Sequence, residues 1–311
     1  MALATQLPQS VDLNIAPSKA QGTFVLQGGD GYPGLHSGET FVVPLYTIRP
    51  ITQYGAITAL VSNANATYHA FTAEAELHGA RAASLRSLEL RGSYTFSRSI
   101  DYGPQSSATP GLNGQFDPFR DGYDRGLSSL HFPQRFSGDL LYTLHMEHGS
   151  KAARRALNGW HMAAIGIAGS GAPYSYHVFG GTRLSGGRET LNGSGGATYL
   201  PTVGRNTLRL PPNARVDLRL SREFSLAKRI RINAFAQAFN LWNTRNLSSI
   251  ETRAYVLGTP AQPGQPTPLL FQDAAEIATA GLSTPPFGTP TSSTTGASRE
   301  RQIELGVRME F

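Results

Sequence analysis

The sequence predicts an all-β protein, namely a segment of an antiparallel up-and-down transmembrane β-barrel with about 7–10 long strands, closed or incomplete. Three observations lead to this fold class. Apolar and polar residues alternate over long stretches, and the connections between these stretches are alternately short and long. The longest uninterrupted apolar stretch, residues 162–168, is far shorter than the roughly 20 residues that a membrane-spanning helix needs.

The alternation is clearest at the carboxy terminus, where every second residue from Ile303 to Phe311 is apolar and the residues between are polar or glycine. A period of two residues places these two sets on opposite faces of a β-strand. The same period predicts strands over 87–97 and 215–221, and less regular alternation predicts strands at 66–79, 133–146, 159–171 and 229–241. Residues 41–61 are expected to add one or two more, although Pro44 and Pro50 interrupt them.

The length of these strands favours a membrane barrel over a soluble sandwich. About 13 residues at roughly 3.4 Å each, tilted by about 40°, span about 34 Å along a barrel axis. Strands of soluble sandwiches usually have only about 5 or 6 residues. A helix over 69–90, where alanine is frequent, is rejected because the polar residues keep a period of two, whereas a short helix over 271–281 is compatible with a loop.

The connections predict a meander with two different ends. Short turns are expected at 80–84, 147–158 and 226–228, and long loops at 100–132, 172–212 and 242–298. Outer-membrane barrels have short turns on the periplasmic side and long loops on the extracellular side. The long connections also carry most of the glycine and proline, which suits exposed backbone.

The composition excludes several classes of function. The net charge is +6, but Lys and Arg are scattered, so the sequence predicts no nucleic-acid partner. The absence of cysteine excludes disulfides, thiolate catalysis and cysteine-based metal sites. No phosphate-binding Gly-rich loop, zinc-binding His-Glu-x-x-His pair or Gly-x-Ser-x-Gly elbow is present. We therefore predict that the chain is not an enzyme and has no cofactor and no metal.

One acidic cluster allows a different interpretation. Asp117, Asp121 and Asp124 could bind calcium through their carboxylates, because hard cations prefer clustered oxygen ligands. Their spacing does not match an EF-hand loop, and Asp and Gly also favour turns. The turn interpretation is preferred.

Six phrases, in collinear order over residues 40–311, resemble the distal barrel of TonB-dependent receptors, especially the Oar-like group that contains a carboxypeptidase-regulatory domain. They are ANATYHAFTAEAEL (64–77), LRGSYTFSRSID (90–101), DRGLSSLHFPQRFSGDLLYTL (124–144), RVDLRLSREF (215–224), RINAFAQAFNLWNTRN (231–246) and RQIELGVRMEF (301–311). The resemblance implies a 22-stranded barrel around an N-terminal plug, with import of scarce substrates driven from the inner membrane.

The resemblance also implies that the chain is the C-terminal part of such a transporter. Residues 1–40 form a poorly defined N-terminal segment and residues 41–311 the C-terminal part of the barrel. No plug, TonB-contacting box or signal peptide is recognised, so the chain is expected to be a truncated or split gene product, or a fragment that begins at an internal Met1, and to contact TonB only through a missing N-terminal part. Its location, if it is exported, is the outer membrane, where lipid is a partner.

Two sets of residues are candidates for function. In the barrel interpretation the polar strand face lines the lumen, with the candidate residues Glu89, Arg91, Arg215, Asp217, Arg219, Arg231 and Gln237. The resemblance further implies that the final strand, with Val307, Met309 and the terminal Phe311, is an assembly signal read by the barrel assembly machinery. An alternative function remains open: a self-contained small β-barrel or β-sandwich surface protein with a structural or adhesive role.

Overall fold

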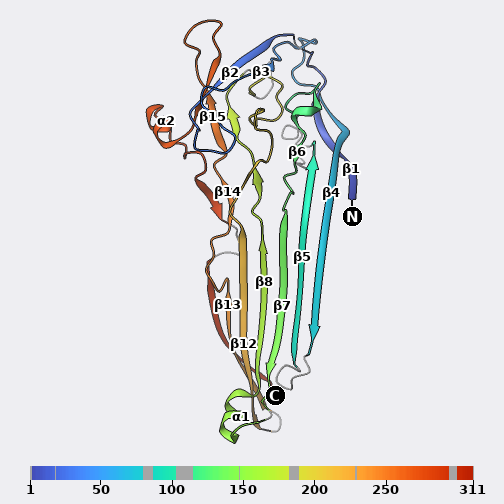
Figure 1. Ribbon diagram of the computed structural model, residues 1–311, viewed down its shortest axis with the longest axis vertical. Helices are drawn as coiled ribbons and strands as arrows, with labels where there is room; N and C mark the ends of the chain where they lie inside the picture. The colour runs from blue at the N-terminus through green and yellow to red at the C-terminus, as the bar shows by residue number, and fades with distance from the viewer. Residues whose placement is uncertain are drawn as a thin grey trace.

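The computed structural model describes residues 2–17, 19–79, 87–102, 115–146, 148–181, 189–227, 230–293 and 300–310. Its main feature is a long nine-stranded sheet in the order β1-β4-β5-β7-β8-β12-β13-β18, with the short β6 beside β5 (Figure 1). The strands are β1 (Ala2–Asp12), β4 (Thr58–His78), β5 (Leu88–Asp101), β6 (Gly126–Leu127), β7 (Gln134–Leu144), β8 (Trp160–Gly169), β12 (Asn213–Ala227), β13 (Ile230–Phe239) and β18 (Gln302–Glu310).

The sheet confirms the predicted fold class. All its strand pairs are antiparallel. Each of the seven regularly alternating stretches is a strand, and residues 69–78 and 88–90 belong to β4 and β5 rather than to a helix. The sequence predicted no strand within residues 1–40, whereas β1 lies there, as does Gln21–Gln27, the strand β2 of a second sheet. The strand β1 alternates only in part. Its alternation is interrupted where the register with β4 shifts between Leu7 and Pro8.

The described connections alternate between the two ends of the sheet as predicted (Figure 1), and the short turn predicted at 80–84 lies outside the described residues. The long connections after β5, β8 and β13 lie at one end, here called the loop end. At the opposite turn end, β7 and β8 are joined through the helix α1 (Lys151–Leu157), which the sequence did not predict, and β12 is followed directly by β13. The described chain also finishes at the turn end.

At the loop end, residues 13–17, 19–57, 115–125, 128–132, 170–181, 189–212 and 240–293 fold together into what we call the loop module. Its main sheet has the order β10-β15-β16-β2-β3, in which β10 with β15 and β16 with β2 are parallel. Its elements are β2 (Gln21–Gln27), β3 (Thr40–Pro44), η3 (Asp121–Tyr123), β9 (Pro173–Tyr174), β10 (His177–Phe179), β11 (Leu208–Arg209), β14 (Leu247–Ile250), β15 (Arg253–Leu257), β16 (Thr267–Phe271), α2 (Ala274–Thr279) and β17 (Pro290–Ser293).

The loop module corrects part of the sequence interpretation. Residues 41–61 were expected to extend the barrel, but β3 belongs to the module's own sheet and only the stretch from Thr58 joins the long sheet. Pro44 ends β3, as a residue without a backbone N–H does at a strand end. The helix considered at 271–281 is present as the shorter α2, whose N-cap Asp273 accepts a hydrogen bond from the Glu276 N–H.

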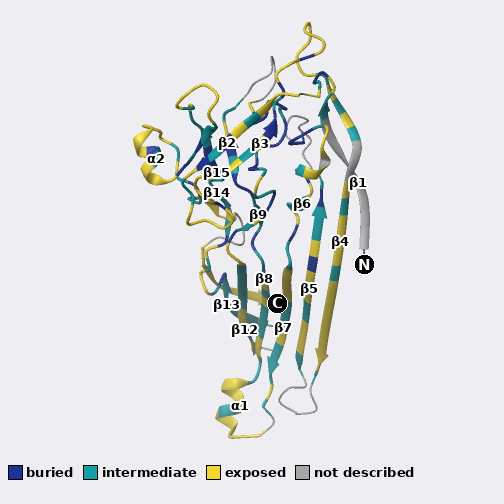
Figure 2. Ribbon diagram, turned by 45° about the horizontal axis from the view of Figure 1, so that its top comes forward, coloured by how far each residue is buried: buried dark blue, intermediate teal, exposed yellow. Residues whose placement is uncertain are grey.

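The apolar core lies in the loop module, not on the long sheet (Figure 2). Among the described residues, every buried apolar side chain belongs to the module. Phe271 is central: its ring lies 4.9 Å from that of Tyr32, 5.3 Å from Tyr255 and 5.6 Å from Phe287. Aromatic side chains bury large apolar areas, so such a cluster allows irregular loops to hold one conformation.

The long sheet instead exposes one apolar face. We call it the apolar face; it includes Phe71 and Leu90 as well as Ile303, Leu305 and Val307 of β18. Leu305 is 80% exposed, Val307 68% and Phe71 66%. No protein layer covers these side chains in the described structure. Neither of the two α-helices described is long and apolar enough to cross a membrane.

We predict that a charge on the apolar face destabilises the protein only when that face contacts lipid. Phe71→Arg should lower the free energy of unfolding in phospholipid bilayers by up to roughly 4 kcal/mol, the usual cost of Arg near the bilayer midplane. The matched control is Thr72→Arg, because Thr72 points to the opposite face, where its hydroxyl lies 3.1 Å from that of Thr95. Equal stability of the two variants in bilayer unfolding titrations would contradict a lipid-covered face.

Candidate functional site

The seven polar residues proposed to line a lumen lie on one face of the long sheet, here called the polar face. The register shows this directly: Arg91 is opposite Asp139, Asp139 is opposite Ile165, and Ile165 is opposite Asp217. Directly opposed residues of antiparallel strands share a face. Glu89, Arg215 and Arg219 follow by the period of two, and Gln237 is opposite Arg219 with Arg231 further along β13.

These residues form local pairs rather than one convergent centre. Arg91 makes an ion pair with Asp139 at 3.1 Å between Nη2 and Oδ2. Arg215 binds Asp217 through two nitrogens, with Nε 2.7 Å from Oδ1, and Oδ1 also accepts a hydrogen bond from the Asn240 N–H at 2.9 Å. Such pairs satisfy each other's charge in place. No group of three or more potential metal ligands occurs among the described residues.

An aromatic ring holds one other charged side chain on this face, that of Arg219. The Arg219 guanidinium lies 4.1 Å from the centroid of the Phe235 ring, within the range of a cation–π contact. The same ring covers Gly306 of β18, where a Cβ atom would lie only 2.3 Å from the ring. Gly306 therefore lets β18 accommodate Phe235. Arg231 reaches Glu223 at 3.8 Å with both side chains largely exposed, and Glu89 lies opposite Leu141.

Two cavities open on the polar face. The upper cavity, nearer the loop end, has a volume of about 510 Å³ and is lined by Ser93, Thr95, Phe132, Arg135, Ser137, Ile167, Asn213 and Arg215 among others. The lower cavity, of about 790 Å³, is lined by Glu74, Glu76, Arg91, Asp139 and their neighbours. The upper lining contains arginines but no carboxylate, whereas the lower lining contains several.

The loop module is attached to the polar face by buried polar contacts. Arg205 of the module pairs with Asp101 at the end of β5 and donates to the Asp101 carbonyl at 2.9 Å, with both side chains almost fully buried. Asn206 Nδ2 donates to the Leu127 carbonyl at 2.7 Å. A buried cation is stable only when paired, so these contacts fix the module's orientation over the sheet.

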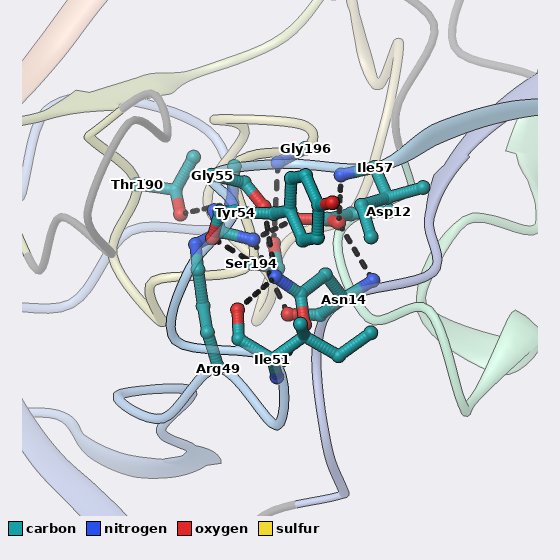
Figure 3. Close-up of polar contacts among 11 residues, drawn as sticks. Asp12, Asn14, Arg49, Ile51, Tyr54, Gly55, Ile57, Thr190, Ser194 and Gly196 are labelled. Carbon is teal, nitrogen blue, oxygen red and sulfur yellow. Dashed lines mark hydrogen bonds and ion pairs between the residues drawn. The ribbon is translucent and has the colours of Figure 1, made fainter.

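A second polar cluster, shown in Figure 3, joins the end of β1 to the segment 49–57. Asn14 is fully buried; its Nδ2 donates to the carbonyls of Ile51, Tyr54 and Gly55 at 2.9, 3.1 and 2.9 Å. Its Oδ1 accepts from the Ile51 N–H at 2.9 Å. Arg49 Nη1 lies 2.6 Å from Asp12 Oδ2. The cluster is an anchor, because its polar atoms face backbone groups of the same protein.

Comparison with known proteins identifies the family to which this sheet and its loop module belong. Residues 2–304 match the family model described as an outer membrane beta barrel domain. The chain belongs to this outer-membrane barrel family. No curated protein and no solved structure matches it. Membership in this family indicates the outer membrane as the location of the domain.

Sequence reasoning found the polar face of the barrel domain but missed its anchors. Alternation could also have indicated Arg135, which precedes Asp139 by four residues in the same predicted strand. In contrast, nothing periodic marks Asn14, Asp101 and Arg205, because they act between segments far apart in the sequence. Val307 and Met309 are exposed on the apolar face, and Phe311 lies outside the described residues, so the assembly signal stays a prediction.

The Asn14 anchor gives a testable prediction. Asn14→Ala would remove the side-chain partner of three carbonyls and one N–H, of which only the Ile51 carbonyl keeps another donor, the Tyr54 N–H at 3.2 Å, and should destabilise the segment 49–57 by roughly 3 kcal/mol. Hydrogen exchange of the amides in this segment should accelerate strongly. Gln262→Ala, which alters an exposed amide of the same module, should leave the exchange unchanged. Similar exchange in both variants would show that Asn14 does not hold the segment.

The acidic cluster of the barrel domain has a structural role in two of its members. Asp124 accepts hydrogen bonds from the Phe116 N–H at 3.1 Å and from the Tyr199 hydroxyl at 2.9 Å. Asp117 Oδ1 accepts from the Tyr46 hydroxyl at 2.6 Å and from the Phe119 N–H at 2.9 Å. The side chain of Asp121 lies outside the described set. Both described carboxylates therefore tie module segments together, in agreement with turn formation.

Burial makes the loop module sensitive to pH through Asp124. Desolvation raises the pKa of this carboxyl from 3.8 to about 6, despite the hydrogen bonds from Phe116 and Tyr199. The folded state thus holds the proton more tightly than the unfolded state. The resulting stabilisation is complete below about pH 4 and is lost as the pH rises through about 6, with a total of roughly 3 kcal/mol.

We expect urea unfolding of the module, followed by tyrosine fluorescence, to show falling stability between about pH 4 and pH 6. Asp124→Asn should remove most of this slope, since the amide does not titrate but can still accept from the Tyr199 hydroxyl. An unchanged slope in the variant would assign the pH dependence to other groups.

Proposed function

We propose that the chain forms the C-terminal part of the barrel wall of a TonB-dependent outer-membrane transporter, and that the substrate passes along its polar face. The observation that carries this proposal is the pair of open edges. Within the described structure, β1 and β18 each have a neighbour on one side only, β4 and β13 respectively. A strand edge in lipid cannot be left unpaired, because its backbone groups find no water there.

The arrangement of the loop module supports the proposal. The module rests on the polar face at the loop end and is fixed there by the Asp101–Arg205 pair. In a wider barrel this position lies over the mouth of the lumen, where a transporter meets its substrate first. In this proposal TonB contacts segments that precede the chain, and the barrel assembly machinery inserts the complete barrel.

One observation favours a second candidate, a small self-contained barrel with a structural or adhesive role. The continuous path of the sheet has eight strands from β1 to β18. About eight strands can close a barrel whose interior is filled by side chains. In that case β1 would pair with β18 of the same chain. The two candidates therefore differ in the partner of β18.

Cysteine cross-linking distinguishes the candidates, because the natural chain has no cysteine. We expect that a cysteine at Val11 in β1, combined with single cysteines along β18, forms no disulfide within the chain. The positive control is Ala236→Cys with Leu305→Cys, which are directly opposed in β13 and β18. Disulfide formation requires Cβ atoms about 3.5–4.5 Å apart, so only neighbouring strands can react.

Two outcomes of this experiment decide between the candidates. When the chain is co-folded with the polypeptide encoded upstream, into which single cysteines are also introduced, the β18 cysteines should form disulfides with that polypeptide instead. Efficient cross-linking between Val11→Cys and β18 within a single chain would contradict the proposal that the chain is part of the wall of a larger barrel. It would establish the small closed barrel instead.

A further inference from the structure

The upper cavity has the lining of a binding site for an anion. Its volume of about 510 Å³ lies within the range of small-molecule sites. Two guanidinium groups, those of Arg135 and Arg215, contribute to the lining together with hydroxyl and amide groups, and no carboxylate does. Arg215 is already neutralised by its two contacts with Asp217. The charge available to a ligand is therefore that of Arg135.

Arg135 is held in place without being neutralised. Its guanidinium carbon lies 4.6 Å from the centroid of the Phe132 ring. A cation–π contact orients the planar group but leaves its N–H donors available. Among the described residues, no acidic side chain forms an ion pair with Arg135. A guanidinium in this state presents a fork of donors that matches a carboxylate.

The support of Arg135 is itself rigid. The Phe132 carbonyl accepts a hydrogen bond from the hydroxyl of Ser97, which is buried, at 2.8 Å. Arg209 of the loop module donates to the neighbouring His131 carbonyl at 2.9 Å and to the Gly171 carbonyl at 3.2 Å. Arg209 has no carboxylate partner in the described structure and adds positive charge beside Phe132. The sheet and the module thus position the ring under Arg135 together.

An apolar surface in the cavity completes the site. Ile167 lies on the polar face, opposite Ser137 and Arg215, yet it is 46% exposed. An exposed isoleucine among arginine and serine side chains makes no hydrogen bond with water. The apolar part of a ligand could instead cover it together with the Phe132 ring. Ser93 and Ser137, which are directly opposed, supply hydroxyl groups between the two parts.

We propose that the upper cavity binds a small organic acid that has one carboxylate and an apolar group, with the carboxylate on Arg135 and the apolar group on Ile167 and Phe132. This inference names a substrate class for the barrel wall and so rests on the proposed function. The lower cavity has the opposite character, because Glu74, Glu76 and Asp139 face a single arginine, Arg91, which is paired. An anion is therefore bound at the loop end.

The test compares benzoate with its neutral analogue benzamide, titrated by ligand-observed NMR against the full chain refolded in neutral detergent, with empty micelles as the blank. Benzoate should bind at least about tenfold more tightly than benzamide, as expected for a charge-assisted bidentate contact. Arg135→Gln should remove this preference while leaving benzamide unaffected. Acetate, which lacks the apolar group, should bind more weakly than benzoate.

Arg219→Gln is the matched control, because Arg219 also lies on the polar face over a phenylalanine ring but does not line the upper cavity. It should bind benzoate like the natural chain. Arg135→Lys, which keeps the charge and loses the fork, should show intermediate affinity and serves if the glutamine variant does not refold. The proposal is overturned if benzoate and benzamide bind equally, if Arg135→Gln and Arg219→Gln behave alike, or if acetate matches benzoate. None of these results alters the cross-linking of β18. The experiments therefore distinguish failure of the proposed anion site from failure of the proposal that the chain is part of a larger barrel wall.

Discussion

The structure depends on the antiparallel ladder that pairs the backbone of one long strand with the next. In hydrocarbon, each N–H and carbonyl that lacks a partner costs several kcal/mol, so the backbone must be satisfied within the sheet. This constraint explains why β4 and β5 face each other over thirteen consecutive residue pairs, from Ala66 to His78. The register shift between Leu7 and Pro8, where Asn63 of β4 has no partner in β1, lies outside the residues of β4 that pair with β5, so it does not interrupt that ladder.

The same ladder determines where the apolar side chains go. The long sheet has an apolar face and a polar face but no buried apolar layer, and residues such as Leu305 are exposed. The loop module forms a core of its own, around Phe271 and Tyr255. The chain therefore contains two kinds of stabilisation, and the Asp101–Arg205 pair joins the parts that rely on them.

This division also explains how much could be predicted from the sequence. In the sheet, the side-chain environment repeats every two residues, so the alternation revealed seven strands and the common face of Arg91 and Arg219. In the module, contacts such as Asn14 with Ile51 join segments that no period connects, and the parallel pairing of β16 with β2 spans most of the chain. Local patterns do not encode such long-range pairs. The strand β1 was missed for a different reason, because Pro8 interrupts the alternation of its residues.

The contacts of the polar-face arginines distinguish those that stabilise the sheet from the one that is available to bind a ligand. Arg91 and Arg215 each have a carboxylate partner, and Arg219 stacks over the Phe235 ring that also covers Gly306. Arg91 and Arg219 contact neighbouring strands and Arg215 binds within β12, so a solute would have to compete with contacts already made. Arg135 has a ring beneath it and no carboxylate partner within the described residues. Since the attraction between unlike charges is strongest where no nearer counter-charge screens it, an anion on this face finds its most favourable position beside Arg135. The loop module confines that position on one side, so in the proposed transporter the upper cavity would select a solute before it passes along the polar face.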